Sequence, residues 1–274
     1  MTAGRGSMAA AVAVLLLTGV AGCGGGPADR PTASPSASSS PTGLPTPTDR
    51  SPRGVLLSAQ LAMTAARRAE FSYRLDGEQA SGMLFWAPKT VLKLKYPHSD
   101  EQLIVLDTTA YRGGDRATAD RTGGRHWEKF SSPGGQREIP YAGLVDRINP
   151  MVALTAAVAA DQPRLLGEED LGESTAQHYR VLLSTDRYVA AQTQLTPARQ
   201  QALRAALAED GVRELTLDLW LNDKDQLVQL RRSGAGGPED TLAYKELGGA
   251  LSVQAPAEND TVDAGGRSLP PLLS

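Results

Sequence analysis

The strongest constraint on the fold is a strict alternation of apolar and polar side chains late in the chain. In LTLDLWL, residues 215–221, every second position is a leucine: Leu215, Leu217, Leu219 and Leu221. Successive side chains of a β-strand point to opposite faces, so a period of two predicts a strand with one apolar face. NDKDQ then predicts a turn, and residues 227–231 a returning strand. The chain therefore contains an antiparallel strand pair with a leucine-rich face.

Shorter runs of strand-forming residues recur from residue 71 onward. Phe71, Tyr73 and Leu75 alternate with polar residues, and Gly, Pro or Asp separates most of the later runs. Short strands joined by short turns predict an antiparallel meander. The other strands expected are 83–86, 91–96, 103–107, 110–112, 126–130, 165–171, 178–183, 242–247 and 251–253.

Three segments have helical periodicity instead. In GVLLSAQLAMTAARRAEF, Leu57 and Leu61 predict the packing face, and the Arg67-Arg68 pair suits the negative end of a helix. Residues 139–160 and 196–211 predict the others, with capping residues and a proline at a helix start in each. This order of strands and helices predicts an α+β fold: one large antiparallel sheet, curled around helices gathered on one face. Such a sheet can enclose an apolar groove.

The first residues are typical of a secretory signal peptide. One basic residue, Arg5, precedes an apolar stretch of Ala, Val and Leu that is too short to remain as a membrane-spanning helix. The stretch ends in Val-Ala-Gly-Cys, which resembles the bacterial lipobox. That resemblance implies acylation of Cys23 and cleavage before it, so residues 1–22 are predicted to be a lipoprotein signal peptide. The alternative is an ordinary signal peptide with an incidental cysteine.

Cys23 is the only cysteine, so the chain has no internal disulfide, and a catalytic role for it would need a histidine and a folded pocket nearby. Two or more acyl chains anchor a protein stably in a membrane. We therefore expect the mature protein on the outer, extracytoplasmic face of the cell membrane, tied to it through Cys23. Residues 24–54 are mostly Gly, Pro, Ser, Thr and Ala, a composition that predicts a disordered tether.

The chain thus divides into a signal peptide (1–22), a lipidated cysteine with its tether (23–54), one folded domain (55–256) and a loose polar tail (257–274). Four segments of the domain together form a recognisable pattern. In chain order they are AYRGGD…GGRHWEKF, NPMVALTAAV, LGEEDLGESTAQHYRVLL and LTLDLWLNDKDQLVQLRR. Together they resemble the LolA-like lipoproteins of actinobacteria, the LppX and LprG group. Asn149 replaces an Asp of that pattern, and Leu171 a Val.

The resemblance implies a half-barrel sheet wrapped around helices, with a cavity that takes up the acyl chains of a lipid or glycolipid. A transporter or another envelope protein is then a candidate partner. Core-facing apolar residues are the candidates for the cavity lining; the alternative is that they form an ordinary filled core. In that case the chain is a non-enzymatic surface lipoprotein acting as an interaction scaffold or sensor. The candidates are Leu75, Leu84, Leu94, Val105, Leu154, Val158, Val181 and Leu217.

Other functions find little support in the sequence. The net charge of -3 and the absence of a basic cluster argue against nucleic-acid binding. His98, His126 and His178 lie in separate strands or turns and do not have metal-ligand spacing. No serine lies in a G-x-S-x-G motif, and the glycine pairs lack the lysine of a phosphate-binding loop. We therefore expect no enzyme activity, no metal site and no cofactor.

Overall fold

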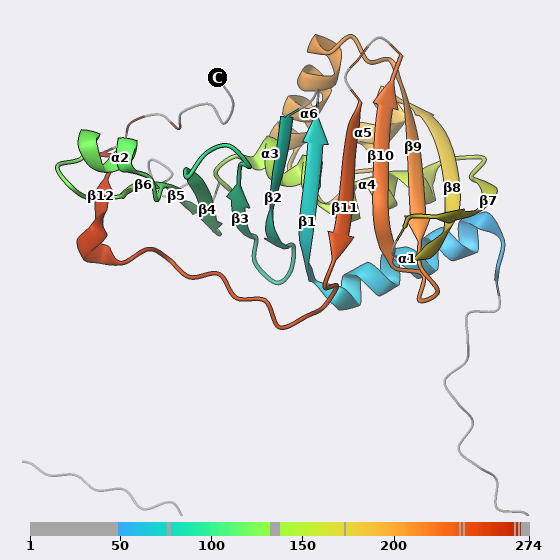
Figure 1. Ribbon diagram of the computed structural model, residues 1–274. Helices are drawn as coiled ribbons and strands as arrows, with labels where there is room; N and C mark the ends of the chain where they lie inside the picture. Colours follow the sequence, from blue (N-terminus) through green and yellow to red (C-terminus); the bar gives the residue numbers. More distant parts are fainter. Residues whose placement is uncertain are drawn as a thin grey trace, which may run out of the picture. The chain divides into compact units, whose positions relative to one another are not determined.

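In the computed structural model of the protein, the described residues form one sheet of 12 strands (Figure 1), in the order β12-β6-β5-β4-β3-β2-β1-β11-β10-β9-β8-β7. Neighbouring strands are antiparallel, except that β12 and β6 are parallel. The strands are β1 (Arg68–Leu75), β2 (Glu78–Phe85), β3 (Val91–Lys95), β4 (Gln102–Leu106), β5 (Thr109–Gly113), β6 (Trp127–Ser131), β7 (Arg164–Asp170), β8 (Thr175–Ser184), β9 (Glu214–Leu221), β10 (Leu227–Gly234), β11 (Asp240–Lys245) and β12 (Thr261–Asp263).

The structure describes residues 49–75, 78–131, 138–172, 174–235, 237, 239–265, 267 and 269, all within the compact unit Thr46–Ser274. The predicted signal peptide, Cys23 and most of the predicted tether lie outside these residues. Five helices lie on one side of the sheet, while α2 adjoins β6 (Figure 1). The helices are α1 (Pro52–Ala66), α2 (Arg116–Arg121), α3 (Ala142–Ile148), α4 (Pro150–Ala159), α5 (Thr185–Ala190) and α6 (Pro197–Glu209).

Two meanders make up all of the sheet except β12, and a single strand pair joins them. Strands β1 to β6 form the first meander, and strands β7 to β11 form the second. The junction is between β1 and β11, where Phe71 lies opposite Tyr244 and Leu75 opposite Asp240. Residues about 170 positions apart in the chain are thus neighbours at the centre of the sheet. The predicted fold class, α+β with one large curled sheet, is confirmed.

The leucine alternation that predicts β9 is confirmed in detail. Leu215, Leu217, Leu219 and Leu221 are all buried in the main apolar core. The intervening Asp218 and Trp220 are buried too, on the opposite face of the sheet. Helix α4 covers the core side, with most of its residues buried, so the sheet and α4 together form a closely packed interior.

The packing face of α1 is not the predicted one. Leu61 is 70% exposed, and Leu57 is also exposed. The buried side carries Val55, Leu56, Ala59 and Met63, which also recur at helical spacing and face α4 and the sheet. Both stripes satisfy the same period, so the pattern alone selects neither. The Arg67-Arg68 pair lies at the carboxyl end of α1: Arg67 caps the helix in a left-handed conformation, and Arg68 begins β1.

The domain is also longer than predicted at both ends. Pro52, Arg53 and Gly54 belong to α1, which Ser51 caps, and not to the tether. Within the predicted tail, Thr261–Asp263 forms β12, which pairs with β6, and Ala264 is buried. Conversely, the predicted strand 251–253 is irregular. The short helices α2 and α5, capped by Asp115 and Ser184, were not expected.

The close approach of β2 and β3 at Gly82 gives a stability prediction. A Cβ added there would lie 1.8 Å from the backbone carbonyl oxygen of Lys93, so Gly82→Ala must push the strands apart. We expect the free energy of unfolding, measured by urea denaturation, to fall by roughly 1–3 kcal/mol. The matched control is Gly143→Ala in α3, where a Cβ meets no atom within 4 Å and helix propensity improves. Equal effects of the two changes would contradict the strand contact.

Candidate functional site

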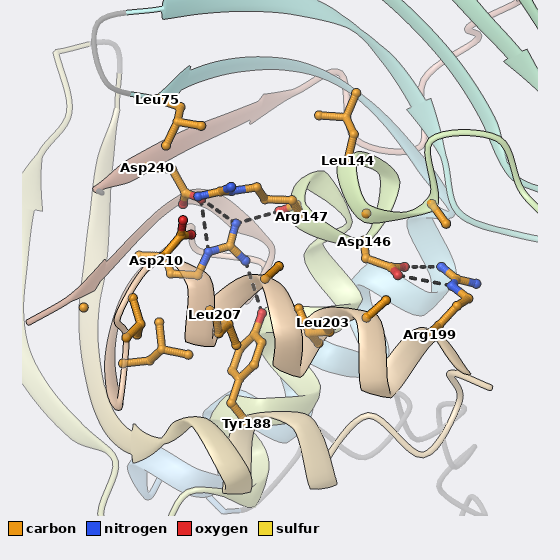
Figure 2. Close-up of a pocket in the computed structure, with 18 of the residues that line it drawn as sticks. Leu75, Leu144, Asp146, Arg147, Tyr188, Arg199, Leu203, Leu207, Asp210 and Asp240 are labelled. Atoms are coloured by element: carbon orange, nitrogen blue, oxygen red, sulfur yellow. Dashed lines mark hydrogen bonds and ion pairs between the residues drawn. The ribbon is translucent and has the colours of Figure 1, made fainter. Parts of the chain in front are cut away.

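A cavity of about 360 Å³ lies between the concave side of the sheet and helices α3 and α6 (Figure 2). Strands β1, β9, β10 and β11 supply its sheet wall, so it sits beside the junction of the two meanders. Apolar side chains make up most of the lining, and the charged residues form two groups, apart from Asp210 at the carboxyl end of α6. The large apolar residues are Leu75, Leu144, Leu203, Leu207, Val212 and Leu215.

A buried ion pair forms the first charged group. Asp240 Oδ2 accepts hydrogen bonds from Arg147 Nε at 2.7 Å and from Arg232 Nη2 at 2.8 Å. Arg232 also donates to the Tyr188 hydroxyl at 3.1 Å and to the backbone carbonyl of Arg147 at 2.9 Å. Burial alone would lower the pKa of Arg232, but Asp240 and Tyr188 outweigh it and raise the pKa. Arg232 is therefore a permanent cation in the wall of the cavity.

The other oxygen of this carboxylate has no such partner. Asp240 is 1% exposed, and its Oδ1 makes no hydrogen bond in the described part of the chain. Buried polar atoms nearly always have a partner, since leaving one unpaired costs about 1–3 kcal/mol. Oδ1 is therefore a buried, unsatisfied acceptor with almost no surface exposed to the cavity.

Helix α6 covers the cavity without being buried itself. None of its residues is buried, and Leu203 and Leu207, which are partly exposed, line the cavity from its inner side (Figure 2). The second charged group holds its first turn: both oxygens of Asp146 on α3 accept from the Arg199 guanidinium. Burial raises the pKa of Asp146, although Arg199 works against this. A polar helix tied down at one end is thus the outer wall of an apolar space.

The eight residues predicted to line a cavity lie in three kinds of position. Leu75 lines the cavity, and Val158 is partly buried against the core. The remaining six are fully buried in the main core: Leu84, Leu94, Val105, Leu154, Val181 and Leu217. Whether any of them contacts a ligand stays a prediction.

The sequence analysis missed the charged residues of the cavity and the leucines of α6. A signal for one of them was present: Arg232 follows Leu230 by two positions, so it continues the apolar face of β10. A charged residue in an inward-facing strand position needs a buried partner. That reasoning could have found Arg232, but not Asp240, which follows a loop.

A second cluster of charged groups lies on the opposite face of the sheet. The His178 ring is stacked on Trp220, with its Nδ1 2.6 Å from Glu169 Oε1 and its Nε2 2.8 Å from Asp218 Oδ1. Arg180 and Arg231 also donate to Asp218. Both ring nitrogens are engaged, and none of these residues lines the cavity described above. The cluster holds β7, β8, β9 and β10 together and presents no free reactive nitrogen.

The remaining histidines are apart from the cavity. His98 is exposed in a turn, and His126 pairs with Asp260 near β12. The described residues contain no group of three His, Cys, Asp or Glu side chains placed to hold a metal ion. In the same part of the chain, no helix is both long and apolar enough to cross a membrane.

Comparison with solved structures shows a likeness to two mycobacterial proteins. LprF from Mycobacterium bovis has a TM-score of 0.50 and 12% identity, over 75% of this chain and 97% of that one. The Mycobacterium tuberculosis lipoprotein LppX has a TM-score of 0.48 and 10% identity, over 76% of this chain and all of the other. The LprF likeness supports the predicted LolA-like fold.

Sequence comparison adds less. An uncharacterised 31.2 kDa protein of Streptomyces griseus is 28% identical over 155 residues. The match spans 54% of this chain and about half, 51%, of the relative. No protein-family model matches the chain.

The second cluster, around His178 and Asp218, predicts that the stability of the folded protein depends on pH. Burial would raise the pKa of Asp218, but hydrogen bonds from Arg180, Arg231 and His178 together lower it. A carboxyl group whose pKa is lower in the folded than in the unfolded state stabilises the folded protein at pH values above its unfolded pKa, about 3.9. This stabilisation is lost as the pH falls through the pKa of the folded state.

We expect Asp218→Asn to lower the free energy of unfolding at pH 7 by about 2–3 kcal/mol. The difference from the unmodified protein should shrink below about pH 4, since the asparagine does not titrate. Urea denaturation at pH 7, 4 and 3 measures it. Asp161→Asn, at an exposed pair with Arg187, is the control and should change little at any pH. A pH-independent loss in Asp218→Asn would contradict the assignment.

Proposed function

We propose that the chain is a membrane-anchored extracytoplasmic lipoprotein that binds a hydrophobic ligand, an acyl chain of a lipid or glycolipid, in the cavity beneath α6. The observation that carries this is the apolar space of about 360 Å³ in a closely packed domain. Small-molecule sites are mainly apolar clefts of about 300–1,000 Å³, so a partly open pocket of this size and lining is typical of a ligand site.

The size of the cavity limits what it can hold. At about 360 Å³ the cavity lies near the lower end of the roughly 300–1,000 Å³ range of ligand pockets. This suits one acyl chain of medium length, and a second chain would need α6 to move outward. Each methylene that leaves a bilayer loses about 0.8 kcal/mol, which an apolar lining of matching length offsets.

The proposed anchor would keep this cavity near its source of ligand. About 25 residues separate Cys23 from the first described residue, and a flexible coil of that length spans roughly 28 Å. The domain would therefore sample the membrane surface without being held against it. An acylated Cys23 would thus keep the lipid-binding cavity within reach of membrane lipids.

A second candidate function is an interaction scaffold, and the edge of the sheet favours it. Within the described part of the chain, strand β7 pairs only with β8, so its other side is an unpaired edge. Leu165 and Leu166 are exposed on this strand. An exposed edge strand can accept a further strand from a partner protein. In this alternative the cavity is incidental.

Filling the cavity tests the main proposal. In Leu207→Trp the larger side chain occupies space beneath α6, so we expect a loss of co-purifying lipid by at least about tenfold, measured by native mass spectrometry of the domain. Leu61→Trp, on the exposed side of α1, is the matched control and should keep the lipid. A lipid-free unmodified domain from a lipid-replete host would contradict the proposal and favour the scaffold.

Removing the acylation site tests the anchor. Cys23→Ser provides no thiol for diacylglyceryl transfer, so the protein should move from the detergent phase to the aqueous phase in Triton X-114 partitioning. Mass spectrometry of the detergent-phase protein should show the acyl groups on Cys23 in the unmodified chain only. Continued detergent partitioning of Cys23→Ser would contradict lipid anchoring at this residue.

A further inference from the structure

The outward side of α1 carries two leucines that no described element covers. Leu57 is 43% exposed and Leu61 70% exposed, and they follow the exposed Arg53 at intervals of four residues. Side chains four positions apart lie on the same side of a helix, so these three form one stripe. The buried residues of the helix, among them Leu56 and Met63, lie on the opposite side and pack against α4 and the core. Helix α1 is therefore apolar on both sides, and only one side has a partner in the described part of the chain.

The stripe is too small for a stable protein interface. The 15 residues of α1 make a helix about 22 Å long, and a helix is about 10 Å across, so the stripe covers on the order of 200 Å². Each partner in a stable protein complex buries about 800 Å². A lipid bilayer needs no matching surface of this size, because the apolar side of a single helix can lie in the interface between headgroups and acyl chains. The two leucines therefore suit a bilayer better than a protein partner.

The chain that precedes α1 also favours a bilayer. Ser51 caps the helix, so the predicted tether from Cys23 leads directly to its first turn. With Cys23 acylated, α1 is the element of the domain nearest to the membrane along the chain. A tether converts a weak contact into an intramolecular one, with an effective concentration in the millimolar range for a short flexible linker. Two leucines can then hold a contact that would be negligible for a free protein.

The charges on α1 do not oppose this contact. The helix contains Arg53 and no acidic residue. Two acidic groups near its first two turns are each paired with an arginine, Asp225 with Arg50 and Asp161 with Arg187. Other acidic side chains, of β7 and of the turn after β9, lie near the same end of the helix. The leucines, and not the charges, must therefore supply most of the attraction.

We propose that the exposed side of α1 docks on the surface of a lipid bilayer, with Leu57 and Leu61 inserted between the headgroups and the upper acyl chains. This rests on the proposed anchor at Cys23, which supplies the bilayer. Helix α1 and the cavity lie at opposite ends of β1, which begins at Arg68 and ends at Leu75 (Figure 1). The docked position would thus hold the cavity away from the bilayer, and loading of the cavity from the bilayer would need the domain to undock.

Fluorescence quenching tests the docked position. A chain that begins at Gly24 keeps the whole compact unit, and a histidine tag at its start replaces the acyl anchor on vesicles that contain a nickel-chelating lipid. The vesicles consist of phosphatidylcholine brominated in its acyl chains, with a minor share of phosphatidylglycerol. In Leu61→Trp we expect the bromines to lower the fluorescence of the added tryptophan by at least about twofold, because its ring enters the interface. The unmodified chain gives the background of its own three tryptophans.

Leu182→Trp is the matched control. Leu182 is 54% exposed on β8 between the buried Val181 and Leu183, so it lies on the face of the sheet away from the helices, and a tryptophan there should not be quenched. In Leu57→Ser combined with Leu61→Trp, the quenching should fall at least about threefold, since half of the apolar stripe is gone. Leu182→Ser combined with Leu61→Trp should leave it unchanged.

The outcomes separate docking from the proposed function. No quenching in Leu61→Trp, or equal quenching in Leu61→Trp and Leu182→Trp, would overturn docking through α1. The tag replaces Cys23 and the measurement needs no ligand in the cavity, so this result would leave lipid binding and the anchor standing. Lipid binding fails instead if the unmodified domain purifies without lipid, and the anchor fails if Cys23→Ser still partitions into detergent. The substituted side chains are all exposed, so these variants keep the core intact.

Discussion

The buried ion pair between Arg232 and Asp240 is the interaction on which the centre of the structure depends. The two residues face each other at the end of the β10–β11 ladder, and Asp240 also faces Leu75 at the end of the β1–β11 ladder. Through Arg147 and Tyr188 the pair reaches α3 and α5. One set of hydrogen bonds thus fixes the strand junction and attaches the helices to it. Because a buried charge that loses its partner is costly, about 3–5 kcal/mol, this arrangement has few alternatives.

The same interaction helps to keep a mainly apolar cavity open at this place on the sheet. A network of fixed hydrogen bonds holds its groups at set positions, so neighbouring side chains cannot collapse freely onto them. Over most of the second meander α4 fills the space, with Val152, Leu154 and several alanines buried. Over the ion pair the cover is α6, which has no buried residue. An apolar, closely packed helix and a polar, loosely packed one therefore divide the concave side into a filled part and an open part.

The sequence predicts the sheet well because strand periodicity is local. The alternation at 215–221 requires no knowledge of distant residues, and β9 forms there. The errors arise where distant contacts decide. The buried stripe of α1 depends on where α4 lies, and β12 forms because β6 offers an edge more than 100 residues away. The candidate site depends on such distant contacts throughout. Of its charged residues, only Arg232 could have been predicted from the local sequence pattern, because it continues the apolar face of β10.

This limit applies directly to the question of lipid binding. Inward-facing leucines and valines have the same period whether a helix fills the space above them or leaves it open, so the pattern predicts an apolar face and not a cavity. Leu217 and Leu215 lie on the same face of β9, yet Leu215 lines the cavity and Leu217 is packed in the core. The difference comes from the covering helix, and in α6 the sequence is informative. PARQQALRAALAE has only two large apolar residues, Leu203 and Leu207, one turn apart. A helix so poor in apolar residues cannot fill a core, and a core covered by such a helix keeps room for something else that is apolar.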